Sequence, residues 1–239
     1  MGINQVDAKQ QTVEMRPSGI AVIRDDFDQG LNPNFWSTQK IEPGRLTFEN
    51  LSGISVARID LKKGDRQEVG GSGKITERDE LMEQKDIQLP LGVNAWYAFS
   101  FYFPEDFSTL DNRTVFAQWK QAEENGSPFL SLRYQKGELL CRVIGDEVNE
   151  KFRSKQTKEL RGQWHRIMMN YQLNANLTGK VHCQLDEEEL VNYEGAMGHK
   201  SLSPSTYFKM GLYRDEVDVL QTVYLAQYRR GNNQADCVI

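Results

Sequence analysis

The segment TYFKMGLYRDE places two phenols, an ammonium group and a glycine at alternate positions, namely Tyr207, Lys209, Gly211 and Tyr213. In a β-strand, alternate residues point to one face of the sheet. Phenol and ammonium groups can move protons and bind anions. The spacing therefore favours a sheet face with acid–base groups around a position left open for a ligand, and Gly211 would leave room for that ligand between Lys209 and Tyr213.

Two other segments, KITERDELM and FAQWKQ, also carry polar residues at alternate positions. The residues that would share a face are Lys74, Thr76, Arg78 and Glu80 in the first segment, and Gln118 and Lys120 in the second. For either segment alone, the solvated face of an antiparallel sheet is the simpler interpretation. Together they combine cations and amides with aromatic residues, which indicates a face that holds an anion.

The elements ERDEL, QWK and YFKMGLY resemble, in the same order, the three signature strands of the jelly-roll polysaccharide lyases. Alginate lyases of this type carry Arg-x-Glu-Leu, Gln-x-His and Tyr-Phe-Lys-Ala-Gly-x-Tyr elements, and the heparin lyase I and glucuronan lyase relatives carry similar Gln-x-His and Lys-x-Gly-x-Tyr elements. The segments WYAFSFYFPEDF, SPFLSLRYQKGEL and GQWHRIMMNYQ resemble framework strands of the latter group, so the resemblance covers most of residues 20–230. It implies an all-β fold, a β-jelly-roll (a concanavalin A-like two-sheet sandwich) with a concave substrate-binding sheet.

The same resemblance implies a role for each matching residue. Arg78 and Gln118 would bind the carboxylate of a uronic acid, and Tyr213 would be the catalytic phenol. Lys120 stands where the family usually has the His that abstracts the proton in many members. The expected substrate-binding residues are Lys209, Tyr207, Glu80, which would hold Arg78 or contact sugar, Arg214 and Lys74.

These roles suit β-elimination, which removes the proton on carbon 5 of a uronic acid and expels the oxygen on carbon 4. Cations and amide donors at the carboxylate stabilise the enolate-like charge that develops. Neighbouring cations such as Lys209 and Arg78 make a phenol more acidic, so that Tyr213 could act as base and then return a proton to the leaving oxygen. Lys120 could instead be the base if other cations depress its pKa. We favour Lys120 as a charge neutraliser, with Tyr213 as both base and acid in a syn elimination.

Composition limits the classes of partner. The 239 residues carry a formal net charge of −5, which argues against a nucleic-acid binder with a general basic surface. No apolar run approaches the roughly 18 residues of a membrane span. We expect an anionic polysaccharide as partner, no nucleic acid, no membrane and a monomer. A secreted or periplasmic location is expected from where such polymers occur, although the opening segment lacks the basic and apolar regions of a signal peptide.

Short segments rich in aromatic and β-branched residues, most of them bounded by Gly, Pro, Asn or Asp, recur along the chain. They predict strands at 19–27, 45–50, 55–61, 96–103, 114–120, 129–134, 139–144, 165–173, 179–186, 207–213 and 221–229. We expect an N-terminal extension over 1–18, a single jelly-roll lyase domain over 19–230 and a tail over 231–239, with short helices in 31–36 and near 81–86. Cys141 and Cys183 are expected to be buried thiols, and the three cysteines give no disulfide framework.

No cofactor is expected for an elimination. Asp25, Asp26 and Asp28 could supply oxygens to a structural calcium ion, as in some relatives, but a plain strand-to-turn segment is the simpler interpretation.

Glucuronan or a heparosan-like polymer is ranked above alginate, because the framework resembles the heparin and glucuronan lyases. One alternative is a non-catalytic carbohydrate-binding module of the same fold, in which Lys120 marks lost catalysis. A laminarinase-type glycoside hydrolase is less favoured, since that class needs paired carboxylates on one strand. Its Glu-x-Asp-x-x-Glu pattern is not reproduced by Glu77, Asp79 and Glu80.

Overall fold

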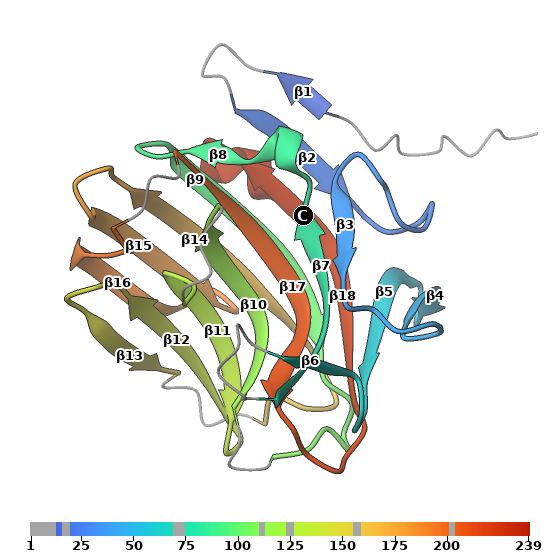
Figure 1. Ribbon diagram of the computed structural model, residues 1–239. Coiled ribbons are helices and arrows are strands. Elements are labelled where there is room, and N and C mark those ends of the chain that lie inside the picture. The colour runs from blue at the N-terminus through green and yellow to red at the C-terminus, as the bar shows by residue number, and fades with distance from the viewer. Residues whose placement is uncertain are drawn as a thin grey trace, which may run out of the picture.

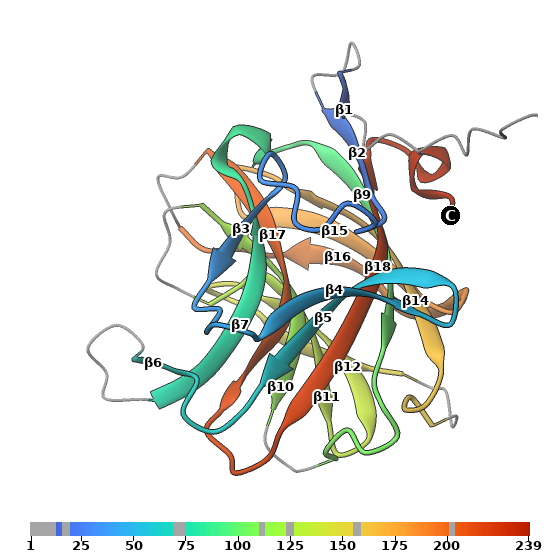
Figure 2. The same ribbon diagram turned by 90° about the vertical axis from the view of Figure 1, so that its right-hand side faces the viewer.

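The computed structural model describes residues 13–15, 20–68, 75–109, 113–122, 127–154, 159–200 and 204–239. Within these ranges the chain forms two antiparallel β-sheets and no α-helix (Figures 1 and 2). The expected all-β, two-sheet jelly-roll sandwich is therefore confirmed.

Sheet A forms one layer of the sandwich. Its main strand order is β1 (Val13–Met15), β2 (Ala21–Asp25), β18 (Gln221–Gly231), β9 (Asn94–Tyr102), β14 (Trp164–Leu173), β15 (Thr178–Leu185) and β16 (Glu188–Ala196), with β5 (Ile54–Leu61) on β18 and β4 (Leu46–Leu51) on β5.

Sheet B forms the other layer and carries all three segments that the sequence singles out. Its main order is β13 (Asn149–Arg153), β12 (Glu138–Ile144), β11 (Leu130–Gln135), β10 (Thr114–Gln121), β17 (Ser205–Asp215), β7 (Ile75–Glu83) and β3 (Trp36–Gln39), with β6 (Arg66–Glu68) on β7 and β8 (Leu89–Pro90) on β17. The strand β17 lies between β10 and β7, although it is far from both in the sequence. This crossover brings the three segments together.

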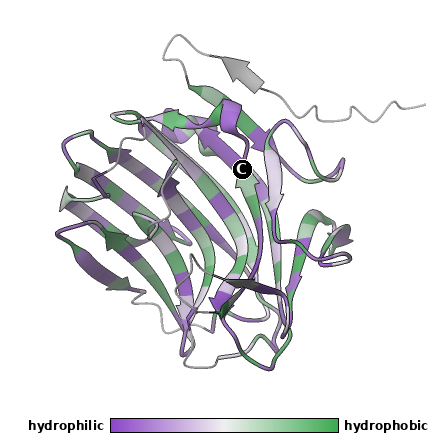
Figure 3. Ribbon diagram, viewed as in Figure 1, coloured by the Kyte–Doolittle hydropathy of each residue, from purple (hydrophilic) through white to green (hydrophobic). Residues whose placement is uncertain are grey.

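The core lies between the sheets because apolar side chains alternate along the strands of both (Figure 3). Aromatic rings join the two layers. Phe208 of sheet B stacks on Tyr228 of sheet A, with their ring centroids 5.7 Å apart, and Trp119 meets Tyr97 edge to face at 5.7 Å. The even-numbered residues of β17 from Phe208 to Leu212 belong to this core, so the odd-numbered ones point to the outer face of sheet B.

Of the two expected short helices, the one in 31–36 is wrong, and the one near 81–86 is confirmed only as a 3₁₀ turn. Residues 31–36 form turns that lead into β3. Residues 81–83 are the end of β7, and only the 3₁₀ turn η1 (Lys85–Ile87) follows. Residues 81–83 form a strand and not a helix because Leu81 and Glu83 are buried on the core side of the sheet.

After β18 the chain continues into a second 3₁₀ turn, η2 (Gln234–Cys237). Asn233 and Asp236 form a reciprocal capping box at its start. The Asp236 carboxylate also accepts a hydrogen bond from the Asn232 backbone N–H at 3.1 Å. The expected boundaries of the extension, the domain and the tail stay predictions.

Candidate active site

The strand register of sheet B places the expected site residues side by side on its outer face. Arg78 of β7 lies opposite Tyr213 of β17, and Gln118 of β10 lies opposite Lys209 of β17. Lys120 lies opposite Tyr207 on the same pair of strands. The structure therefore brings these residues together from three strands.

Tyr213 is held between two guanidinium groups. The Arg78 guanidinium carbon lies 4.1 Å from the centroid of the Tyr213 ring, and that of Arg113 lies 4.8 Å from it. Arg113 Nη2 also donates a hydrogen bond of 3.0 Å to the Tyr213 hydroxyl oxygen. Burial opposes the charge of Arg113, but Tyr213 and Asp215 raise its pKa. The phenol oxygen thus receives an N–H from a cation that stays protonated.

Glu80 connects the two groups expected to bind a carboxylate. It lies on the outer face but is fully buried by its neighbours. Arg78 Nε lies 3.1 Å from Glu80 Oε2, and Gln118 Nε2 donates a hydrogen bond to Glu80 Oε1. Of the two roles considered for Glu80, the geometry favours that of a group which orients Arg78 and Gln118.

Lys209 is a nearly buried cation, with only 2% of its surface exposed. It donates a hydrogen bond to Gln39 Oε1 of β3, and its Nζ lies 5.4 Å from the centroid of the Tyr207 ring. Burial, followed by the charges of Arg78 and Lys120, lowers the pKa of Lys209 to about 8 against the opposing effect of Glu80. Lys209 is therefore poised to lose its charge just above neutral pH.

Tyr207 behaves differently from Lys209. Burial, with a contribution from Glu80, raises the pKa of Tyr207 to about 12. Its hydroxyl therefore stays protonated and can only take part in binding through a neutral hydrogen bond or ring contact.

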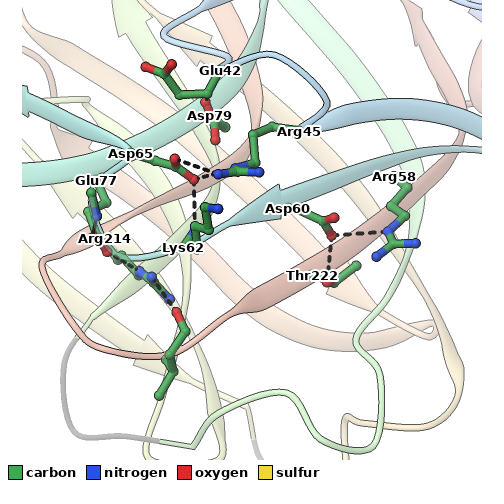
Figure 4. Close-up of polar contacts among 12 residues, drawn as sticks. Glu42, Arg45, Arg58, Asp60, Lys62, Asp65, Glu77, Asp79, Arg214 and Thr222 are labelled. Carbon is green, nitrogen blue, oxygen red and sulfur yellow. Dashed lines mark hydrogen bonds and ion pairs between the residues drawn. The ribbon is translucent and has the colours of Figure 1, made fainter.

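Arg214 does not join this set, so its expected role as a substrate-binding residue is corrected. Its side chain is fully buried on the core side, where Nε donates to Glu77 Oε2 at 2.8 Å (Figure 4). Its Nη1 donates to Gln221 Oε1 at 2.9 Å. The physical reason is the strand alternation, which turns the residue after Tyr213 to the opposite face. The remaining expected residue, Lys74, lies outside the described residues.

Gly211 has a different function from the one expected. Its φ is +142°, and a Cβ atom there would lie 2.4 Å from the Asp79 carbonyl oxygen and 2.8 Å from the Glu80 Cα. The missing side chain thus lets β17 approach the β7 backbone, and the expectation that it clears space for a sugar is corrected.

Three arginines of the same region were not identified from the sequence: Arg113, Arg133 and Arg142. Arg133 in β11 and Arg142 in β12 each alternate with apolar residues of their own strand. This alternation could have identified them from the sequence as residues of the outer face. Arg113 lies just before β10 in a segment without a pattern, so only the strand register reveals its contact with Tyr213.

Two of the three residues considered for calcium, Asp25 and Asp26, make other polar contacts. Asp25 accepts hydrogen bonds from the Phe27 backbone N–H at 2.9 Å and from Trp36 Nε1 at 2.8 Å, which occupies both carboxylate oxygens. Asp26 pairs with Arg229 at 2.6 Å. Within the part of the chain that the structure describes, no group of three or more His, Cys, Asp or Glu side chains could hold a metal.

The three cysteines Cys141, Cys183 and Cys237 are buried and free. Burial raises the pKa of Cys141 to about 12, so its thiol stays protonated. Among the described residues, no helix has the length and apolar character required to cross a membrane.

Comparison with known proteins gives one family match. The model of the family described as "Polysaccharide lyase" matches residues 28–229. No protein with a curated description matches the chain.

Several solved structures share the fold. An endo-β-1,4-glucuronan lyase from the fungus Trichoderma reesei superposes with a TM-score of 0.66 at 17% identity, covering 90% of this chain and 97% of its own. The alginate lyase A1-II′, of polysaccharide lyase family 7, gives 0.58 at 12% identity, with 81% and 85% covered. The cellulose-induced protein Cip1 gives 0.55 at 10% identity, with 88% and 97% covered.

Proposed function

The chain belongs to the polysaccharide lyase family, and on that premise we propose that it cleaves a uronic-acid-containing polysaccharide by β-elimination on the outer face of sheet B. The observation that carries the proposal is the position of Tyr213. Its hydroxyl accepts a hydrogen bond from Arg113, its ring contacts Arg78, and Arg78 is tied through Glu80 to Gln118.

The first step of the proposed mechanism is the capture of the carboxylate beside the reacting carbon. Arg78 can meet a carboxylate with two parallel N–H groups, and Gln118 supplies an amide. Glu80 fixes both partners before the substrate arrives, so little reorganisation is needed when negative charge develops. Donors that bind this charge lower the cost of removing the proton on carbon 5.

The second step is proton transfer by Tyr213. As the base, its phenolate would take the proton on carbon 5, and the resulting phenol would return a proton to the oxygen on carbon 4 as that bond breaks. Arg113 points an N–H at the phenol oxygen, a geometry that stabilises negative charge there. One group that serves as base and then as acid must reach the proton on carbon 5 and the oxygen on carbon 4 from the same face of the sugar. This corresponds to a syn elimination.

Lys120 is proposed to neutralise charge rather than to abstract the proton. Together with Lys209 it supplies positive charge opposite Gln118 and Tyr207. The charge of Lys120 contributes to the lowered pKa of Lys209, which places the two cations within electrostatic reach of each other. These two cations suit the binding of a polysaccharide that carries many carboxylates.

Glucuronan is the substrate that we rank first, followed by a heparosan-like polymer and then alginate. The framework strands resemble those of the glucuronan and heparin lyases, and the fold is shared with the fungal glucuronan lyase. We further propose that the protein acts as a monomer outside the cytoplasm, where such polymers occur.

The main alternative is a carbohydrate-binding module, and the observation that favours it is Lys120 at the usual position of the family's His. The hydrolase alternative is weakened by the structure. Glu77 and Asp79 point to the core side while Glu80 faces outward, so the three carboxylates do not share a face.

A single assay separates these functions. The protein is incubated with glucuronan, heparosan and alginate, and both ultraviolet absorbance of an unsaturated uronate product and reducing ends are measured. Rising absorbance supports the lyase, reducing ends without absorbance support a hydrolase, and binding without either supports the module. The control is Arg24→Gln, which removes an exposed cation from sheet A.

A further inference from the structure

A cationic pair on the outer face of sheet B, formed by Arg133 of β11 and Arg142 of β12, has no role in the elimination described above. Arg133 lies opposite Val115, which in turn lies opposite Tyr213, so Arg133 is two strands, or about 10 Å, from the proposed base. Arg142 lies opposite Ser131, which is opposite Gln118. The pair therefore continues the rows of Tyr213 and Gln118 away from β7.

The side chain of Arg133 is largely buried within this face of the sheet. Only 7% of its surface is exposed, and its Nε donates a hydrogen bond of 3.0 Å to Ser131 Oγ, which fixes the direction of the guanidinium group. Burial, followed by the charges of Arg142 and Arg113, lowers the pKa of Arg133 to about 10 against smaller opposing effects of Tyr213 and Asp215. Three guanidinium groups thus repel one another at this end of the site.

Within the described part of the chain no carboxylate forms an ion pair with Arg133 or Arg142, and the charge of Asp215 acts on Arg133 less than the charges of Arg142 and Arg113 do. The ion pairs of the structure involve other residues, and the Nε of Arg142 is buried without a hydrogen-bond partner. Burial and the charge of Arg113 also lower the pKa of Arg142. The residue opposite Arg142 on the neighbouring strand β13 is another cation, Lys151. A largely buried cation that is not paired with a carboxylate is costly, so the pair is suited to an anion from outside the chain.

We propose that Arg133 and Arg142 form a second carboxylate-binding position, which holds the carboxylate of a uronate next to the sugar that is cleaved. This inference rests on the proposed function and names its substrate more closely, as a polymer with carboxylates on consecutive sugars. A chain that crosses β17, β10 and β11 carries its next carboxylate toward the pair. Two guanidinium groups at diagonal positions on neighbouring strands can share one carboxylate.

The test measures binding in the Tyr213→Phe background, so that no cleavage is required. Isothermal titration calorimetry with a hexasaccharide of β-1,4-linked glucuronate compares the parent with Arg133→Gln/Arg142→Gln. A heparosan hexasaccharide, in which uncharged sugars alternate with uronates, is titrated in parallel. Arg24→Gln, an exposed cation of sheet A, controls for the loss of positive charge. Thermal unfolding checks the fold, and the single variant Arg142→Gln replaces the double variant if the latter does not fold.

We expect the Kd for the glucuronate hexasaccharide to rise at least about fivefold in the variant, and the Kd for the heparosan hexasaccharide to rise less. A smaller rise, an equal rise for both oligosaccharides, or no binding of oligoglucuronate by the parent overturns the inference. Cleavage is measured separately with wild-type protein. Binding that depends on the arginines without any cleavage would overturn the proposed function alone, whereas cleavage without this dependence would overturn the second position alone.

Discussion

Arg113 Nη2 lies 3.0 Å from the Tyr213 hydroxyl oxygen and 3.3 Å from Asp215 Oδ1, so one nitrogen joins the proposed base to a carboxylate. The two contacts hold the guanidinium group against the phenol. Arg113 does not need to touch the substrate to act, because it can position Tyr213 and stabilise negative charge on its oxygen.

We therefore expect Arg113→Gln to lower kcat by about 10- to 100-fold while KM changes little, since a charge-assisted hydrogen bond is lost from the reacting group. Arg113→Lys should recover part of kcat. Steady-state rates on the best polymer, with Arg24→Gln as control, check this. A change confined to KM would show that Arg113 binds substrate instead.

Lys209 gives the site a pH dependence. Its pKa is lowered to about 8, so the ammonium is charged below that pH and becomes neutral as the pH rises through it. If this charge binds the substrate, kcat/KM of the wild type should fall above about pH 8 relative to that of Lys209→Arg, whose side chain stays charged. The ratio of the two kcat/KM values is measured from about pH 6 to pH 10. A ratio that stays constant would mean that the charge of Lys209 does not contribute.

Asp79 predicts a pH-dependent stability. Its Oδ1 accepts a hydrogen bond from the Glu42 backbone N–H, its Oδ2 is buried without a partner, and burial, followed by the charge of Asp65, raises its pKa to about 8. Figure 4 shows these groups with Arg45, which pairs with Asp65 at 2.7 Å.

The folded state therefore holds a proton on Asp79 that the unfolded state releases near 3.8, the ordinary pKa of an aspartate. This contribution to stability is fully present below the unfolded pKa and is lost as the pH rises toward about 8. Asp79→Asn cannot ionise, so its stability relative to wild type should increase from pH 5 to pH 8 by at least about 1 kcal/mol. Urea unfolding at both pH values measures this. An unchanged difference between the two proteins would mean that Asp79 is ionised in the fold.

Gly211→Ala tests the close approach of β17 and β7. The added Cβ would lie 2.4 Å from a backbone oxygen, so we expect a loss of about 2–4 kcal/mol in the free energy of unfolding. The matched control is Gly53→Ala, which also has a positive φ, of 88°, but nothing within 4 Å of the new atom. Thermal unfolding of the two variants should separate a steric effect from a conformational one. Equal losses of stability in the two variants would contradict a steric role for the close approach of β17 and β7.

The alternation of residue types predicted which of the candidate residues share a face of sheet B. Arg78 and Glu80, Gln118 and Lys120, and Lys209 and Tyr213 fall on one face, as their spacing indicated. The same alternation excludes Arg214, which directly follows Tyr213 and so points to the core, although the family motif suggested a role for it in binding.

Other features depend on contacts between distant segments, which no local pattern encodes. A β-bulge between Val115 and Ala117 shifts the register of β10, and it decides which residues of that strand lie opposite β17. Arg113 meets Tyr213 only because β10 and β17 are neighbours, about a hundred residues apart in the chain. The lowered pKa of Lys209 likewise depends on burial in the folded sheet and on the charges of Arg78 and Lys120 from neighbouring strands.

The central claim is that Tyr213 transfers the proton, and comparing Tyr213→Phe with Lys120→Gln tests it most directly. Both purified variants and the wild type are given the polymer that the wild type cleaves best, and formation of the unsaturated product is followed by ultraviolet absorbance. We predict that Tyr213→Phe abolishes this signal while still binding the polymer, and that Lys120→Gln loses only about tenfold, because a neutraliser is replaced by a polar group. Full activity of Tyr213→Phe, or a Lys120→Gln variant as inactive as Tyr213→Phe, would contradict the account.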